Sequence, residues 1–158
     1  MHASTRGAAA DSSLSPHAFE QRLAWLAKRL EADGDVEALD RGKRELHRLV
    51  AFRVLSPGYG LPLEATFEHR ELWERRRREG WSLLRYAYEY RPLPRPSRRA
   101  YHLHEPLGEH QHCVPPRGAS DRHFRAYRLS LLEAHEDFAA AQASGRPARC
   151  DGLLPLRP

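Results

Sequence analysis

The first regular pattern along the chain is a stripe of apolar residues at helical spacing. Ser15 and Pro16 provide an N-cap residue followed by proline, which is the preferred order at the start of a helix. We therefore predict an amphipathic helix from Pro16 to about Gly34 that packs one face on a sheet. Residues 1–14 are small and polar without periodicity, and we expect them to form a disordered leader. The apolar positions of the helix are Phe19, Leu23, Leu26, Ala27 and Leu30.

Strand patterns occupy the middle of the chain, between turn signals rich in proline and glycine. In the third of four segments, Tyr86, Tyr88 and Tyr90 share one face, as the period of two in a strand requires. We expect this tyrosine stripe to be half-buried. The arginine-rich residues 74–80 predict a turn, with a helix over Leu72–Arg78 as the alternative. The four predicted strands are Glu45–Leu55, Leu63–Trp73, Trp81–Tyr90 and Arg99–Glu105.

A second amphipathic stripe predicts a C-terminal helix. It begins at Ser120 or Asp121, either of which can cap a helix, and runs to Gly145. Residues 146–158 are rich in proline and leucine, and we expect an extended strap. Residues 15–145 then form one α+β domain, an antiparallel sheet of about four strands with an N-terminal and a C-terminal helix packed on it. The apolar stripe of the last helix consists of Phe124, Tyr127, Leu131, Ala134 and Phe138.

Charge adds a candidate binding surface to this picture. The 158-residue chain has a net charge of +5, and 24 of its 26 basic residues are arginine. It contains no Ile and no Asn, so a G+C-rich gene could explain the arginines. Composition does not explain their position, because ten Arg and four Glu between His69 and Arg99 carry +6 while the rest sums to −1. This segment predicts a basic patch that attracts phosphate, or else an exposed, solvated hairpin.

The expected location follows from what the sequence lacks. No apolar run approaches the roughly 20 residues that cross a bilayer, and the first residues have no secretory signal. We therefore expect a cytoplasmic protein. Cys113 and Cys150 are too few for a disulfide framework, so we expect any chemistry at Cys113 to be thiol or metal chemistry in a reducing compartment. We expect Cys150 to be a small apolar residue of the tail.

A histidine cluster carries the candidate chemistry. The segment Tyr101–Cys113 holds four of the ten histidines and one of the two cysteines. In extended chain, His102 and His104 point to one face, and His110 and His112 share a face in the same way. A turn at residues 106–108 could bring the two pairs together, with Cys113 and His123 as further candidates.

Three interpretations of this cluster compete. In the first, His102, His104, His110, His112 and Cys113 hold zinc or another divalent metal, because imidazole and thiolate are preferred zinc ligands. The spacing matches no Cys-X-X-Cys finger or ribbon pattern. The metal would support either hydrolysis or a non-catalytic, zinc-stabilised binding module. In the second interpretation the histidines perform acid–base chemistry. In the third they are structural, in a protein whose helices dock a partner.

The acid–base interpretation is cleavage of RNA. One imidazole would accept the proton of a ribose 2′-hydroxyl and another would protonate the leaving oxygen, because their pKa lies near neutrality. We assign His104 and His112 to these roles, within the four-histidine set, and Tyr86 or Tyr101 to positioning the nucleotide. Cations must also neutralise the phosphate. The phosphate-binding candidates are Arg85, Arg91, Arg98 and Arg99.

A family resemblance points the same way. A strand with Arg85-Tyr86-Ala87-Tyr88, then His102-Leu103-His104, then His110-Gln111-His112 before a C-terminal helix resembles the TumE-type small toxins of bacterial toxin–antitoxin systems. The resemblance covers about residues 45–140. It implies a ribonuclease with an antitoxin partner, and it carries over the four histidines as site residues. The N-terminal helix, the proline-rich insertion after Arg91, Cys113 and the C-terminal strap depart from that family.

Overall fold

The computed structural model describes residues 13–44, 46–57, 64–78, 80–93, 97–115, 121–145, 150 and 152–156. Its two helices are α1 (Pro16–Leu30) and α2 (Leu131–Ala143). Its strands are β1 (Ser13–Leu14), β2 (Asp35–Arg44), β3 (His47–Ser56), β4 (Glu64–Arg76), β5 (Gly80–Leu93), β6 (Arg98–His104), β7 (Gly108–Val114) and β8 (Arg122–Arg125).

All strands belong to one antiparallel sheet. Strands β2 to β8 follow one another across it in chain order, and the short β1 pairs with β5. The predicted α+β domain with about four strands is therefore wrong, because the chain forms an eight-stranded sheet with only two helices. Ser13 and Leu14, predicted as leader, belong to β1, and residues 1–12 lie outside the described part of the chain.

The unpredicted strands lack a strong apolar signal. Strand β2 lies at one edge of the sheet, and most side chains of residues 35–40 are exposed. Strand β8 has only four residues and replaces the first turns of the predicted last helix. Helix α2 begins ten residues later than Asp121, where Ser130 and Glu133 form a capping box. By contrast, α1 begins at Pro16, directly after its N-cap residue Ser15, as predicted.

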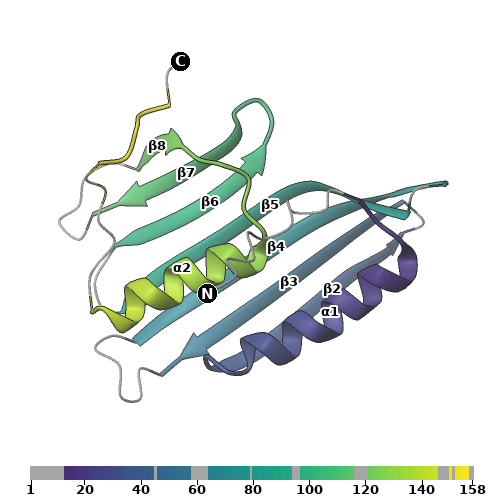
Figure 1. Ribbon diagram of the computed structural model, residues 1–158, viewed down its shortest axis with the longest axis horizontal. Helices are drawn as coiled ribbons and strands as arrows, with labels where there is room; N and C mark the ends of the chain where they lie inside the picture. The colour runs from purple at the N-terminus through teal and green to yellow at the C-terminus, as the bar shows by residue number, and fades with distance from the viewer. Residues whose placement is uncertain are drawn as a thin grey trace, which may run out of the picture.

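Both helices cover the same face of the sheet (Figure 1). We call this the helix face, and the opposite one the open face. The core between helices and sheet includes Phe19, Leu26 and Leu30 from α1, and Leu131, Ala134 and Phe138 from α2. The tyrosine stripe of β5 is part of this core and is fully buried rather than half-buried, with Tyr88 and Tyr90 at 0% exposure.

Charged groups on the helix face of β4 are buried as well. Glu71 is 1% exposed and accepts two hydrogen bonds of 2.7 Å from Arg22 of α1. Trp73 Nε1 and the Tyr88 hydroxyl also donate to Glu71, at 2.9 and 2.7 Å. This network stabilises the contact between α1 and the sheet because the buried carboxylate is fully paired. No helix in the described ranges is both long and apolar enough to span a membrane.

Candidate metal centre

The β6–β7 hairpin brings the predicted histidines together on the open face. Its register places His102 opposite His110, and His104 opposite Gly108. The turn closes at Gly108, whose φ of +65° lies in the left-handed region that favours glycine. On the next strand, His123 of β8 lies opposite His112. Five imidazoles from three neighbouring strands therefore share one patch, which we call the histidine cluster: His102, His104, His110, His112 and His123.

The rings of this cluster pack directly against one another. The centroids of His102 and His112 are 4.4 Å apart, as are those of His112 and His123. The His110 ring lies 4.7 Å from His104 and 5.0 Å from His112. Packing buries the centre of the cluster, where His110 is 0% and His112 is 7% exposed. One ring nitrogen from each of His102, His110 and His112 lies within 4.8 Å of the others, close enough to hold one metal ion.

Two of these rings face each other through their Nε2 atoms, which are 3.1 Å apart in His110 and His112. On the far side of each ring, Nδ1 meets an acceptor. The Gly108 carbonyl lies 2.9 Å from His110 Nδ1, and Asp121 Oδ2 lies 3.0 Å from His112 Nδ1. In neutral rings the hydrogen then sits on Nδ1, so both Nε2 atoms carry lone pairs. Two lone pairs pointing at each other require a cation, either a proton or a metal, between them.

Burial disfavours the proton. It lowers the pKa of His112 to about 4, and the nearby His102 lowers it further, although Asp121 opposes both effects. Burial also lowers the pKa of His110. Two nitrogens about 2.0–2.1 Å from a tetrahedral zinc ion lie about 3.3 Å from each other, so the observed separation suits a shared ion. The His110–His112 pair therefore has the donor atoms and spacing of two metal ligands.

Two carboxylates support the cluster from outside. Asp121 holds His112, and Glu89 Oε1 of β5 lies 3.5 Å from His102 Nε2. The contact with His102, together with Arg98 and Arg91, lowers the pKa of Glu89 well below its usual range, although burial opposes the shift. Arg98 donates to Glu89 at 2.8 Å and to Asp121 at 2.9 Å, and so fixes both carboxylates. Carboxylates behind imidazoles are the usual outer partners of metal-binding histidines.

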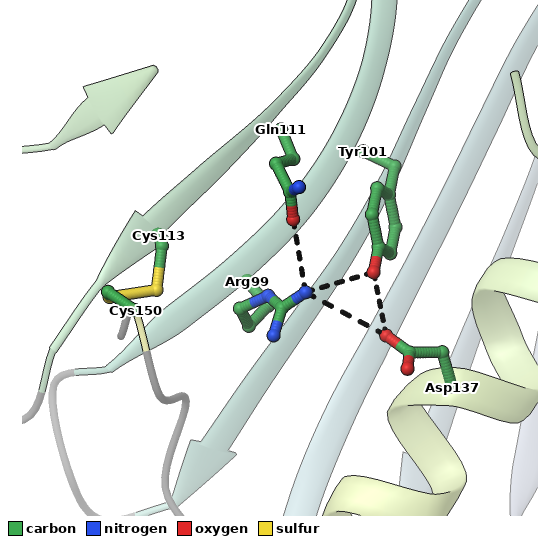
Figure 2. Close-up of a disulfide and its surroundings, with 6 residues drawn as sticks. All are labelled: Arg99, Tyr101, Gln111, Cys113, Asp137 and Cys150. Atoms are coloured by element: carbon green, nitrogen blue, oxygen red, sulfur yellow. Dashed lines mark hydrogen bonds and ion pairs between the residues drawn. A yellow bond between two sulfur atoms is a disulfide. The ribbon is translucent and has the colours of Figure 1, made fainter. Parts of the chain in front are cut away.

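The predicted phosphate-binding arginines do not form one free cationic site at the cluster. Arg98 is occupied by the two carboxylates, and Arg91 by Glu89 at 2.9 Å. Arg99 points to the helix face, where it donates to Tyr101 and Gln111 (Figure 2). Arg85 is exposed, and the alternation along β5 places it on the open face with Glu89.

The predicted tyrosines are also on the wrong face for this site. Tyr86 is buried under the helices and stacks on Tyr88, with ring centroids 4.5 Å apart. Tyr101 donates to Asp137 of α2 at 2.8 Å, and burial raises its pKa to about 12. Neither hydroxyl lies among the histidines. Tyr101 alternates with His102 along β6, and Tyr86 lies opposite Leu103, which also alternates with the histidines.

Cys113 is not a metal ligand in this structure. It forms a disulfide with Cys150, so it has no thiolate, and it lies on the helix face beside Arg99 (Figure 2). The expectation of thiol or metal chemistry at Cys113, with Cys150 as a separate apolar residue of the tail, is therefore wrong. The sheet register explains the separation, since Cys113 is one residue from His112 and must point the opposite way.

Sequence reasoning missed the two carboxylates of the site. Glu89 shares the face of Arg85 and Ala87 in the strand pattern, opposite the tyrosine stripe. This alternation is the sequence signal that could have placed Glu89 on the open face. Asp121 was predicted as a helix cap, but it directly precedes β8. His123 was named beside the cluster, yet on a helix rather than on a strand.

Comparison with known proteins adds no relative for this site. No protein-family model matches the chain, and neither a curated protein nor a solved structure matches it. The resemblance to TumE-type toxins therefore remains a prediction.

Proposed function

We propose that the chain binds one divalent transition-metal ion, with zinc as the reference ion, through His102, His110 and His112. The observation that carries the proposal is the pair of Nε2 atoms 3.1 Å apart in His110 and His112, each left with a lone pair by an acceptor at Nδ1. Imidazole nitrogens suit zinc and the other late first-row metals. Three protein ligands leave a coordination position for water or substrate, as in catalytic zinc sites.

The proposal is tested by metal analysis of tag-free protein purified without chelator. We expect about one zinc per chain, consistent with a single three-histidine site. His110→Ala removes the central ligand and should abolish the bound metal. The matched control is His17→Ala, which removes an exposed histidine of α1 and should leave the metal content unchanged. Equal metal content in His110→Ala and wild type, with both folded, would contradict the proposed site.

RNA cleavage is the second candidate function, and one observation favours it. Arg125 lies opposite His110 in the sheet and is exposed. Arg85 is exposed on the same face, and within the described ranges neither guanidinium has an acidic partner. Arg125, in register with His110, and Arg85, exposed on the same face of the sheet, are cations that suit a phosphodiester substrate. For this second candidate function we also propose a cytoplasmic location. The resemblance to TumE-type toxins adds an antitoxin as the proposed partner.

In this second candidate, His104 and His112 would serve as general base and acid, with or without a metal on the neighbouring rings. Cleavage of a short RNA is the assay. His112→Ala should lower the rate by roughly 10²-fold or more, and Arg125→Ala should raise KM more than it lowers kcat. Arg53→Ala, which changes an exposed open-face arginine on β3 away from the cluster, is the control. Cleavage that is unchanged in His104→Ala and in His112→Ala would exclude these roles.

A further inference from the structure

The disulfide ties the C-terminal tail to the sheet directly behind the histidine cluster. Cys113 follows His112 on β7, and its sulfur is bonded to Cys150 of the tail. Cys113 is 1% exposed, whereas Cys150 is partly exposed. The two cysteines also pack with Phe124 and Leu153 in a small apolar cluster that is separate from the main core. Cys150 is therefore the more exposed end of this bond.

The tail held by this bond lies along the outer edge of β8. The Arg125 amide donates to the Leu154 carbonyl at 2.8 Å, and the Leu156 amide donates to the His123 carbonyl at 3.1 Å. Pro155 lies opposite Phe124 as an isolated bridge. Figure 1 shows the tail, coloured yellow, beside β8. Strand β8 has four residues, and among the described strands it pairs with β7 alone, so the tail provides its second set of backbone hydrogen bonds.

Strand β8 in turn holds part of the metal site. Asp121 directly precedes it and accepts the hydrogen bond of His112 Nδ1 at 3.0 Å. His123, on β8 itself, packs on His112 with ring centroids 4.4 Å apart. If β8 frays, Asp121 loses the support of the strand that follows it. Arg98 still contacts Asp121, but the hydrogen bond that fixes the tautomer and orientation of His112 weakens. Loss of such an outer partner typically costs about 10–100-fold in metal affinity.

We infer that the Cys113–Cys150 disulfide is a redox site for a dithiol reductant, and that its reduction weakens metal binding by releasing the tail from β8. The inference rests on the proposed metal site and names its regulation. In a reducing cytoplasm, the proposed location, a disulfide is most often transient or redox-sensing, which agrees with a bond that joins a buried cysteine to a partly exposed one.

The chemistry is thiol–disulfide exchange. A thiolate of the reductant attacks Cys150 Sγ, the sulfur–sulfur bond breaks, and its electron pair leaves on Cys113 Sγ, which takes up a proton. In the mixed disulfide, the first sulfur of the reductant is bonded to Cys150 Sγ. The second thiol of the reductant attacks that first sulfur and releases Cys150 as a thiol. The reductant has lost two electrons and two protons and has become a disulfide, while the protein has gained two thiols.

The test measures cobalt(II) binding to the full chain, because tetrahedral cobalt has a visible spectrum and reports affinity directly. We compare oxidised wild type, wild type reduced with a phosphine, and Cys150→Ser. Both reduced forms should bind cobalt about 10-fold more weakly or worse. Hydrogen exchange of the Arg125 amide should become faster, while amides of β3 and β4 stay protected, which shows that the fold is intact.

A double-mutant cycle identifies the route. Asp121→Asn breaks the contact with His112 while leaving the disulfide intact, and should weaken cobalt binding to a similar extent. In that background Cys150→Ser should add little, because both changes remove the same support of His112. Unchanged affinity in Cys150→Ser, fully additive losses, or global loss of protection on reduction would each overturn the inference. Failure of oxidised wild type to bind cobalt would overturn the metal site as well, so the two failures are distinguishable.

Discussion

A buried histidine pair makes the stability of this fold sensitive to acid. His69 of β4 is 0% exposed, and its Nε2 lies 3.0 Å from Nδ1 of His135 on α2. His135 Nε2 lies 2.8 Å from Asp33, so a neutral His69 donates to His135, which donates to the carboxylate. Burial lowers the pKa of His69 to about 3, and the neighbouring His135 lowers it further. The perturbation we consider is a drop from pH 7 to pH 5.

The size of the effect follows from linkage. Above about pH 6.5 the ring is neutral in both folded and unfolded chains, and it contributes no pH dependence. Below that value the unfolded chain binds a proton that folded His69 rejects, so the free energy of unfolding falls as the pH falls from about 6.5 towards about 3. The interval from the unfolded-state pKa of about 6.5 down to pH 5 is about 1.5 pH units. At about 1.36 kcal/mol per pH unit, His69 lowers the free energy of unfolding at pH 5 by about 2 kcal/mol.

Urea unfolding at both pH values measures this cost. His69→Gln keeps an amide that can donate to His135, and it removes the titrating group. The stability lost between pH 7 and pH 5 should be about 2 kcal/mol smaller in His69→Gln than in wild type. His135, whose pKa burial also lowers, is present in both proteins and largely cancels. His17→Gln, at an exposed position of α1, should behave as wild type. Equal losses in wild type and His69→Gln would refute the reasoning.

Three other predictions follow from the core, the helix cap and the metal site. Glu71→Gln should cost about 3 kcal/mol in urea unfolding, because it leaves Arg22 without its buried partner; Glu68→Gln, on the open face of the same strand, should cost about 1 kcal/mol or less. Ser130→Ala should cost about 1 kcal/mol by removing the cap of α2. In calorimetry, a chelator should lower the Tm of wild type but not of His110→Ala. The first prediction would be contradicted if Glu71→Gln and Glu68→Gln lost similar free energies of unfolding, and the second if Ser130→Ala were as stable as wild type. The third would be contradicted if the chelator changed the Tm of wild type and His110→Ala equally.

The period of two was sufficient to predict how the histidines group. It placed His102 with His104 and His110 with His112, and the hairpin register brings both pairs to one face. The same rule also separates Cys113 from them, because adjacent residues in a strand point to opposite faces. The sequence could not indicate the partner of Cys113, since Cys150 is 37 positions away and only the folded tail brings it near.

Long-range pairing also decided which arginines are free. The density of arginine between His69 and Arg99 indicated positive charge, but the carboxylates that occupy Arg98 come from Glu89 on a neighbouring strand and from Asp121, 23 residues away. Strands β2 and β8 escaped prediction for a related reason. They form through backbone pairing with their neighbours rather than through an apolar pattern of their own, and β2 is an exposed edge strand.

The two-sided use of β6 and β7 has a consequence for how the chain tolerates insertions and deletions. Alternate residues of each strand contribute to the histidine cluster on one face, and to the contacts of Tyr101 and Gln111 on the other. A single residue added within Arg98–His104 would exchange the two sets, moving imidazoles beneath α2 and Tyr101 into solvent. Residues added beside the exposed Leu107 would only lengthen the turn and keep both faces in register. Variation in length should therefore be confined to this turn, while the strands accept only substitutions.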